Sequence, residues 1–152
     1  MGQELFPHKW QMDAAGKLEI DRTFVPCPVE DGDEIYPNGI FLFNITKLLE
    51  HIEQNPGQYL FEEIPVENLS LFSSSLKDDH ASLADITRPI ILAEISPGRY
   101  AVTDGHHRLE RARRMMVKTI PAYRLHVHQH IPFLIEKRAY LAYVEYWNSK
   151  IA

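Results

Sequence analysis

The chain has 152 residues, of which 45% are apolar and 24% charged, and its formal net charge at pH 7 is −5. This length and composition are typical of one globular domain and exclude collagen, low-complexity disorder and disulfide-stapled scaffolds. The acidic balance disfavours a protein whose whole surface binds nucleic acid. A single cysteine excludes an internal disulfide. The sequence holds no apolar run of membrane-spanning length, so we expect a cytoplasmic protein without a membrane partner.

The first third of the sequence contains two candidate strands. Lys17–Val25 alternates apolar and polar residues as a strand does, and Pro26 and Pro28 would end it. Val29–Glu34 is typical of an acidic turn, and Gly39–Phe43 predicts a short apolar strand.

A helix is predicted to follow directly. Asn44 is a favourable N-cap, and Asn55-Pro56-Gly57 would stop the helix. Four apolar residues between these signals recur at helical spacing: Ile45, Leu48, Leu49 and Ile52.

The middle of the chain predicts a hairpin. Ile64–Val66 is a short strand, and the Ser/Asp-rich stretch Ser73–Asp79 leads into a short helix that ends before Arg88. Pro89–Ile95 and Arg99–Thr103 are strongly strand-forming, and the Ser-Pro-Gly between them predicts a turn.

The last third predicts a helix, a strand and a closing helix. Gly105 would open a helix to Met116 that buries Leu109, Ala112 and Met115 or Met116. Thr119–His128 alternates as a strand does. Pro132 suits the first turn of a closing helix, on which four aromatic or apolar residues share a face: Phe133, Tyr140, Val144 and Trp147.

Together these elements predict a single α+β domain with a small mixed sheet packed with helices. No internal repeat and no Gly/Ser-rich linker divides the chain. We expect residues 1–59 to form an extension packed on the core, residues 60–128 to form the core, and residues 129–152 to form a C-terminal helix.

The chemically informative stretch is Asp104-Gly105-His106-His107-Arg108, placed between a predicted strand and a predicted helix. Helix N-termini attract anions because their N–H groups are unpaired. Gly105 would let a phosphate approach the backbone, Arg108 would hold it with two hydrogen bonds, and His107 would add a donor. Asp104 either caps the helix or, beside phosphates, holds Mg²⁺ or accepts a proton.

Basic residues continue along the same helix. We expect them to form a solvated face on which Glu110 pairs with Arg114 at i, i+4: Arg111, Arg113, Arg114 and Lys118.

Together with segments on either side, this stretch resembles the ParB/sulfiredoxin superfamily, over about 60 of the 152 residues. The resembling segments are Ile64-Pro65-Val66-Glu67-Asn68-Leu69, Arg88-Pro89-Ile90-Ile91, Tyr100 to Arg108, and Thr119-Ile120-Pro121-Ala122. The resemblance implies a nucleotide whose phosphates contact the glycine and His-Arg turn, which in this chain is Gly105, His106, His107 and Arg108.

The branches of this superfamily differ in chemistry. Sulfiredoxins place a cysteine before the His-Arg pair, where this chain has His106, so sulfinic-acid reduction is not expected. Partition ParB proteins bind CTP and DNA and carry a helix-turn-helix domain, and we do not expect such a second domain within these 152 residues. A third branch, similar to free-serine kinases, keeps an Asp-Gly-His-His-Arg turn and a catalytic carboxylate near its first strand. Glu62 and Glu63 lie 42 and 41 residues before Asp104 and are the candidates in this chain.

A second constellation is formed by His126, His128 and His130, which would share one face if the strand continued that far. Three imidazoles on one face are a candidate Zn²⁺ or Ni²⁺ site. We expect solvent-facing or packed histidines instead, because i, i+2 side chains on a flat strand rarely converge on one ion.

Three functions follow from these observations. The first is a nucleotide-binding, kinase-like enzyme that uses ATP, ADP or CTP with Mg²⁺ on Asp104, an upstream glutamate as the base and a small-molecule acceptor. The second is a ParB-like DNA-associated or nuclease domain using the basic face from Arg111 to Lys118. The third is a non-catalytic nucleotide-binding module. Whether the protein is an enzyme stays open.

Overall fold

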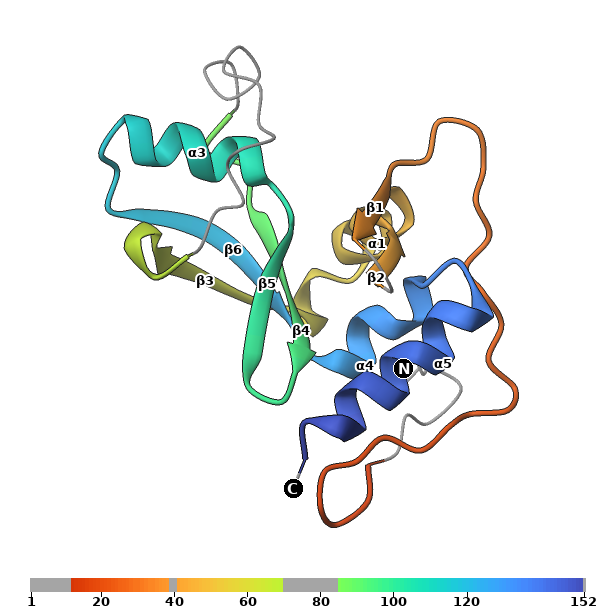
Figure 1. The fold of residues 1–152 in the computed structure, drawn as a ribbon. Helices are drawn as coiled ribbons and strands as arrows, with labels where there is room; N and C mark the ends of the chain where they lie inside the picture. Colours follow the sequence, from red (N-terminus) through yellow and green to blue (C-terminus); the bar gives the residue numbers. More distant parts are fainter. Residues whose placement is uncertain (1–11, 39–40, 70–84, 152) are drawn as a thin grey trace.

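The computed structural model describes residues 12–38, 41–69 and 85–151 (Figure 1). Its main sheet has four strands in the order β3-β6-β4-β5. These strands are β3 (Leu60–Pro65), β4 (Ile90–Ser96), β5 (Arg99–Asp104) and β6 (Thr119–Leu125). The central pair β4 and β6 is parallel, whereas β3 with β6 and β4 with β5 are antiparallel. The structure therefore confirms the α+β class, the small mixed sheet and the predicted hairpin.

A second, two-stranded sheet pairs β1 (Ile35–Asn38) with β2 (Phe41–Asn44). The sequence predicted only the second of these strands, because the acidic stretch before β1 is typical of a turn and gives no strand signal. The Ser/Asp-rich stretch 73–79 and the short helix predicted after it lie outside the described residues.

The predicted helix after Asn44 is confirmed as α1 (Ile45–Gln54). The side chain of Asn44 accepts a hydrogen bond from the backbone N–H of Lys47 at 3.0 Å, which satisfies one of the free donors of the first turn. Three of the four predicted apolar positions are buried: Ile45, Leu48 and Ile52.

Helix α3 (His106–Arg114) follows the predicted turn and packs Leu109 and Ala112 against the sheet. Met115 and Met116 were expected in its buried stripe, and this prediction was wrong, because they are 51% and 87% exposed. The helix ends at Arg114, and Met116 has a positive φ of 58°, so both methionines point away from the core.

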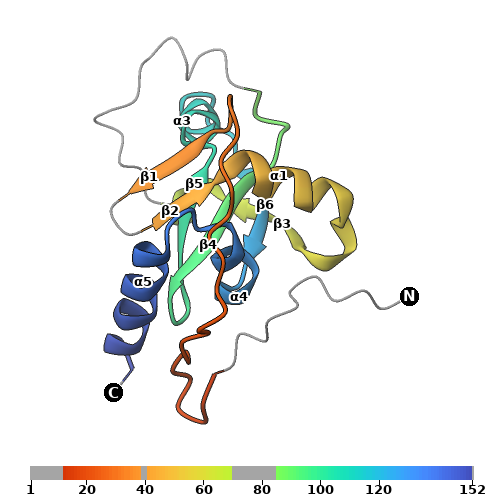
Figure 2. The same ribbon diagram turned by 90° about the vertical axis from the view of Figure 1, so that its right-hand side faces the viewer.

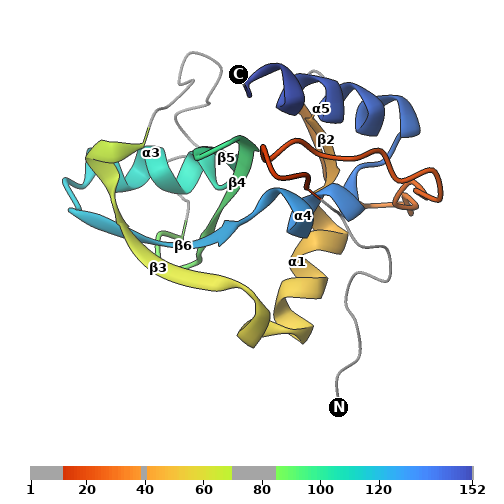
Figure 3. The ribbon, with the colours of Figure 1, turned by 90° about the horizontal axis from the view of Figure 1, so that it is seen from below.

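Two helices cover the two faces of the main sheet. Side chains of α3 pack on the face that carries Ile90 and Ile120, whereas α1 packs on the face that carries Ile91 and Leu125 (Figures 1 and 3). A third cluster joins β2 to α4 (Val127–His130) and α5 (Lys137–Ser149). Three short 3-10 helices complete the described elements: Pro56–Gln58, Val66–Asn68 and Ile131–Phe133.

The predicted strand over Lys17–Val25 is wrong: beyond a single bridge at Leu18, this segment forms no strand. Asp21 accepts hydrogen bonds from the backbone N–H and the hydroxyl of Thr23, which makes a turn in its middle. The segment instead runs beside α5, where Asn148 exchanges two hydrogen bonds with the backbone of Leu18 (Figure 2).

The end of the predicted strand Thr119–His128 and the start of the closing helix were also wrong. The strand stops at Leu125, and α4 begins at Val127. Pro132 lies in a 3-10 turn, and α5 starts five residues later. Phe133 is therefore not on that helix, although the other three predicted positions share its buried face: Tyr140, Val144 and Trp147.

None of the helices in the described ranges is long and apolar enough to cross a membrane. The division into residues 1–59, 60–128 and 129–152 stays a prediction.

Candidate functional site

The predicted turn lies where the edge strand β5 passes into α3. Gly105 is the first flanking residue of the helix and has a φ of +107°, a left-handed conformation that favours glycine. A Cβ at this position would lie 2.4 Å from Cγ2 of Ile90 and 2.9 Å from Nη2 of Arg108. The glycine is therefore required by the fold itself, because both the backbone conformation and the close packing exclude a side chain.

Asp104 and Arg108 form an ion pair across this glycine. Nη2 of Arg108 donates to Oδ2 of Asp104 at 2.8 Å. The side chain of Arg108 is only 10% exposed and that of Asp104 only 13%. One interpretation of the sequence was that Asp104 caps the helix, and this interpretation was wrong. Gly105 is the N-cap, and no side chain makes the cap hydrogen bond. The carboxylate is instead committed to the guanidinium.

Arg108 is incompletely satisfied. Its Nε atom is buried and has no hydrogen-bond partner in the part of the chain that the structure describes. The first turn of α3 carries no acidic residue. One carboxylate thus faces both a guanidinium and the positive end of a helix, and the turn keeps an excess of positive potential.

The two histidines of the motif are half-buried. The ring of His106 lies parallel to the ring of Tyr36 on β1, with centroids 6.4 Å apart. Burial lowers the pKa of His106, and the charge of Asp104 only partly opposes this effect. His106 is therefore neutral at pH 7, and Arg108 supplies the fixed positive charge of the turn.

The structure does not bring the glutamates of β3 to this turn. Glu62 pairs with Ala122, Ala122 with Ile90, and the next residue of β4 pairs with Asp104. Two strands thus separate Glu62 from Asp104, a lateral distance of about 14 Å at roughly 4.8 Å per strand. Glu62 is ion-paired with Arg124 at 2.5 Å, and Glu63 accepts a hydrogen bond from the hydroxyl of Thr119 at 3.1 Å.

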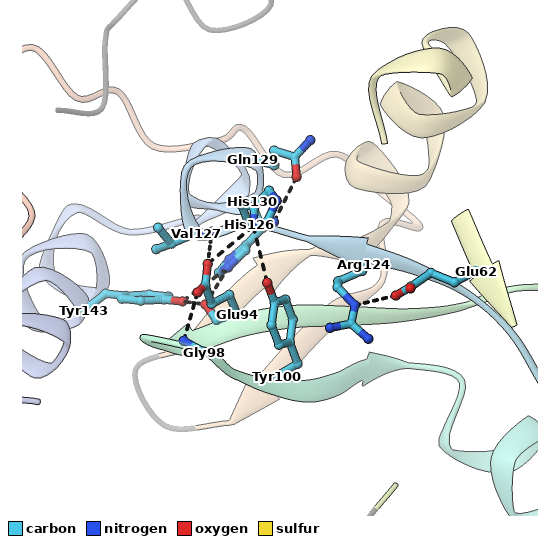
Figure 4. Close-up of polar contacts among 10 residues, drawn as sticks. All are labelled: Glu62, Glu94, Gly98, Tyr100, Arg124, His126, Val127, Gln129, His130 and Tyr143. Carbon is cyan, nitrogen blue, oxygen red and sulfur yellow. Dashed lines mark hydrogen bonds and ion pairs between the residues drawn. The ribbon is translucent and has the colours of Figure 1, made fainter. Parts of the chain in front are cut away.

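A polar cluster around Glu94 was not predicted from the sequence (Figure 4). The carboxylate of Glu94 accepts hydrogen bonds from the backbone N–H groups of Gly98 at 3.0 Å and Val127 at 3.2 Å. Its backbone carbonyl accepts from the hydroxyl of Tyr143 and lies 2.9 Å from Nε2 of His130. Glu94 therefore joins the main sheet to α4 and α5. The one signal in the sequence is a carboxylate within the otherwise apolar run Ile90–Ile95.

Two further contacts extend this cluster toward Glu62 (Figure 4). The hydroxyl of Tyr100 lies 3.3 Å from Nδ1 of His126, and the guanidinium of Arg124 lies over the Tyr100 ring, 4.8 Å from its centroid. Arg124 is therefore oriented from both sides, by the carboxylate of Glu62 and by the ring of Tyr100.

The three alternating histidines do not share a strand face, because His126 flanks α4, and His128 and His130 lie within it. His126 and His128 are exposed, whereas His130 is fully buried. Across the described ranges, no group of three or more histidine, cysteine, aspartate or glutamate side chains is arranged to hold a metal ion. Two of these histidines thus face solvent and one is packed, and the strand geometry assumed for the metal alternative was wrong.

Two arginines of the basic run on α3 make hydrogen bonds within the protein. Arg114 donates to Glu110 at 2.9 Å, as the i, i+4 spacing predicted, and Arg113 donates to the backbone carbonyl of Leu69. Arg113, Arg114 and Lys118 are exposed, as expected of a solvated face, whereas Arg111 is half-buried.

No family model matches this chain, and no curated protein matches it. Among solved structures, it is similar to the C-terminally truncated chromosome-partitioning protein ParB from Caulobacter crescentus complexed with CTP-gamma-S, with 19% sequence identity and a TM-score of 0.34. The match covers 61% of this chain and 54% of that ParB chain, so this chain spans about half the length of the ParB chain that it matches.

Proposed function

We propose that this chain binds a phosphate-bearing ligand of the nucleotide class at the turn Asp104–Arg108. The observation that carries the proposal is the buried Nε of Arg108, which has no hydrogen-bond partner among the described residues and stands beside the uncapped N-terminus of α3. A buried guanidinium nitrogen without a partner costs free energy. A phosphate at this turn would accept from it and would also face the positive end of the helix.

The charges at the turn also support the binding of an anion. A cation in the first turn of a helix is unfavourable because the helix dipole is positive there. Arg108 occupies that position, and among the described residues its ion-pair partner is Asp104. A phosphate group would add the negative charge that the turn lacks.

The identity of the ligand rests on the motif. The resemblance of Asp104-Gly105-His106-His107-Arg108 to the nucleotide-binding turn of the ParB/sulfiredoxin superfamily favours ATP, ADP or CTP. A role for Mg²⁺ fits only if the ligand helps to bind it, because the described residues offer the single carboxylate of Asp104 at this turn and no cluster of three metal-binding side chains. Mg²⁺ commonly combines one or two carboxylates with phosphate oxygens and water.

The proposal is limited to binding. Two strands, β6 and β4, separate Glu62 from Asp104, and Glu62 is held by Arg124, so this arrangement does not support a phosphate transfer in which Glu62 and Asp104 act on one atom. We expect Glu62→Gln and Glu63→Gln to keep the ligand affinity of the natural chain.

The test is ligand-induced thermal stabilisation with ATP, ADP, CTP and inorganic pyrophosphate, each with and without Mg²⁺. A ligand at a hundred times its dissociation constant stabilises the folded state by about 2.7 kcal/mol. We expect this stabilisation to disappear in Arg108→Ala and to persist in Arg111→Ala, which removes an arginine from the same helix. If the alanine variant does not fold, Arg108→Lys, which keeps the charge, replaces it in the test, and we expect this variant to bind the ligand more weakly than the natural chain does. Stabilisation that survives both Arg108 variants, or no stabilisation of the natural chain, would overturn the proposal.

A further inference from the structure

The guanidinium of Arg108 already lies where the ligand would have to approach. Nη2 is 2.9 Å from the position that a Cβ of Gly105 would take, so the guanidinium covers the glycine. The same Nη2 is bonded to Asp104 at 2.8 Å. The Asp104–Arg108 ion pair therefore lies beside the glycine that the proposed ligand would approach.

We propose that Asp104 competes with the bound anion for Arg108, so that the Asp104–Arg108 ion pair is the closed state of the site. This inference rests on the proposed function, because it concerns how that site opens. Asp104 and the phosphate carry the same sign of charge and seek the same donors. The site therefore binds an anion only when Arg108 leaves Asp104 or when the charge of Asp104 is neutralised.

Burial makes this competition strong. Both side chains are largely shielded from water, and an ion pair is stronger in such an environment than at an exposed surface. Neighbouring side chains add little further charge to this ion pair. His106 is neutral because burial lowers its pKa. The exposed Asp85 has a pKa lowered chiefly by hydrogen bonds from Thr87, with smaller contributions from Arg88 and Arg108. Asp85 thus feels the charge of Arg108 without an ion pair to it.

A divalent cation changes the balance. Asp104 would hold such a cation together with the bound phosphate, and the charge of the cation would neutralise the carboxylate and leave Arg108 to the ligand. The cation and the anion then bind with positive coupling, because each removes the obstacle to the other. Removing the charge of Asp104 by mutation has the same effect on the anion and abolishes the effect of the cation.

The experiment titrates inorganic pyrophosphate into the natural chain and into Asp104→Asn, with and without Mg²⁺, by calorimetry. Without Mg²⁺ we expect Asp104→Asn to bind pyrophosphate about tenfold more tightly. With Mg²⁺ we expect the affinity of the natural chain to rise and that of Asp104→Asn to stay the same. The charge-matched control is Asp85→Asn, which removes a carboxylate near Arg108 without breaking the ion pair and should change the affinity less than about twofold.

A second readout follows the ion pair directly. The Nη–H resonances of Arg108, whose Nη2 donates to Asp104, should shift in ¹⁵N NMR spectra on addition of pyrophosphate to the natural chain and on the Asp104→Asn substitution, because both break this bond. If Asp104→Asn does not fold by circular dichroism, Asp104→Ser removes the same charge. Equal or weaker pyrophosphate binding by the uncharged variant, with binding by the natural chain intact, would overturn this inference and leave the proposed function standing. Absence of binding to both proteins would overturn both.

Discussion

Gly105 shows how one residue serves both the fold and the candidate site. Gly105→Ala would place a methyl group 2.4 Å from Cγ2 of Ile90 on a backbone with a φ of +107°. We expect a loss of more than about 3 kcal/mol in the free energy of unfolding, because left-handed strain and steric overlap add. Urea denaturation of both proteins measures it.

The matched control is Gly98→Ala. Gly98 also has a positive φ, +74°, but no atom lies within 4 Å of its Cβ position. Only the backbone strain applies there, and we expect a loss of about 1–2 kcal/mol. Similar losses for the two variants would show that steric overlap with Ile90 adds nothing to the backbone strain at Gly105.

Residue types and short spacings predicted part of the site. The Asp-Gly-His-His-Arg motif correctly placed a turn between a strand and a helix, because glycine and helix-start signals act locally. The ion pair of Asp104 with Arg108 was missed, although their i, i+4 separation is a recognisable signal. The separation of Glu62 from Asp104 had no local signal, since it depends on the order in which distant strands pair.

At the level of single elements, α1 depends on its N-terminal cap. The buried amide of Asn44 accepts from the N–H of Lys47 and donates to the carbonyl of Pro28 at 3.1 Å and to the carboxylate of Asp33 at 2.8 Å. Asn44→Ala removes all three bonds and leaves their partners unsatisfied, so we expect a loss of about 2–4 kcal/mol in urea denaturation.

Asn55→Ala is the control at the other end of this helix. The Asn55 side chain donates one hydrogen bond, to the carbonyl of His51 at 3.0 Å. We expect its removal to cost about 0.5–1.5 kcal/mol. A larger loss in Asn55→Ala than in Asn44→Ala would contradict the dependence of α1 on its N-terminal cap.

Elements with strong local signals were predicted well, and those shaped by distant contacts were not. The cap and apolar spacing of α1 lie within one segment. By contrast, the alternating histidines suggested a strand, while Val127, Ile131 and Leu134 recur at i, i+4 and i+7, which is the helical signal that was missed. The late start of α5 comes from Leu134, whose carbonyl accepts from the N–H of Cys27. That contact holds the chain extended where Pro132 alone suggested a helix.

Over the whole molecule, buried histidines make the folded state sensitive to acid. Burial lowers the pKa of His130 from 6.5 to about 3, and it also lowers the pKa values of the half-buried His51 and His106. As the pH falls below about 6.5, the unfolded chain binds protons that the folded chain does not. The free energy of unfolding should therefore decrease with falling pH, by up to about 1.4 kcal/mol per pH unit for each fully shifted histidine.

The measurement is the urea midpoint between pH 7 and pH 4. We expect His130→Gln, which does not titrate, to have a flatter dependence than the natural chain, and the partly buried His51→Gln to change the dependence less. Parallel curves for His130→Gln and the natural chain would contradict the assignment of a buried, neutral His130.

The hydrogen bonds between the N-terminal segment and α5 also bear on the order in which the protein folds. Leu18 and Asn148 are 130 residues apart in sequence, and the contact of Gly16 with Trp147 spans 131. Such contacts require nearly the entire chain to be closed into a loop, whereas the β4–β5 hairpin closes over a few residues. The N-terminal segment should therefore dock late, after the sheet has formed, and substitutions at Asn148 should accelerate unfolding more than they slow refolding.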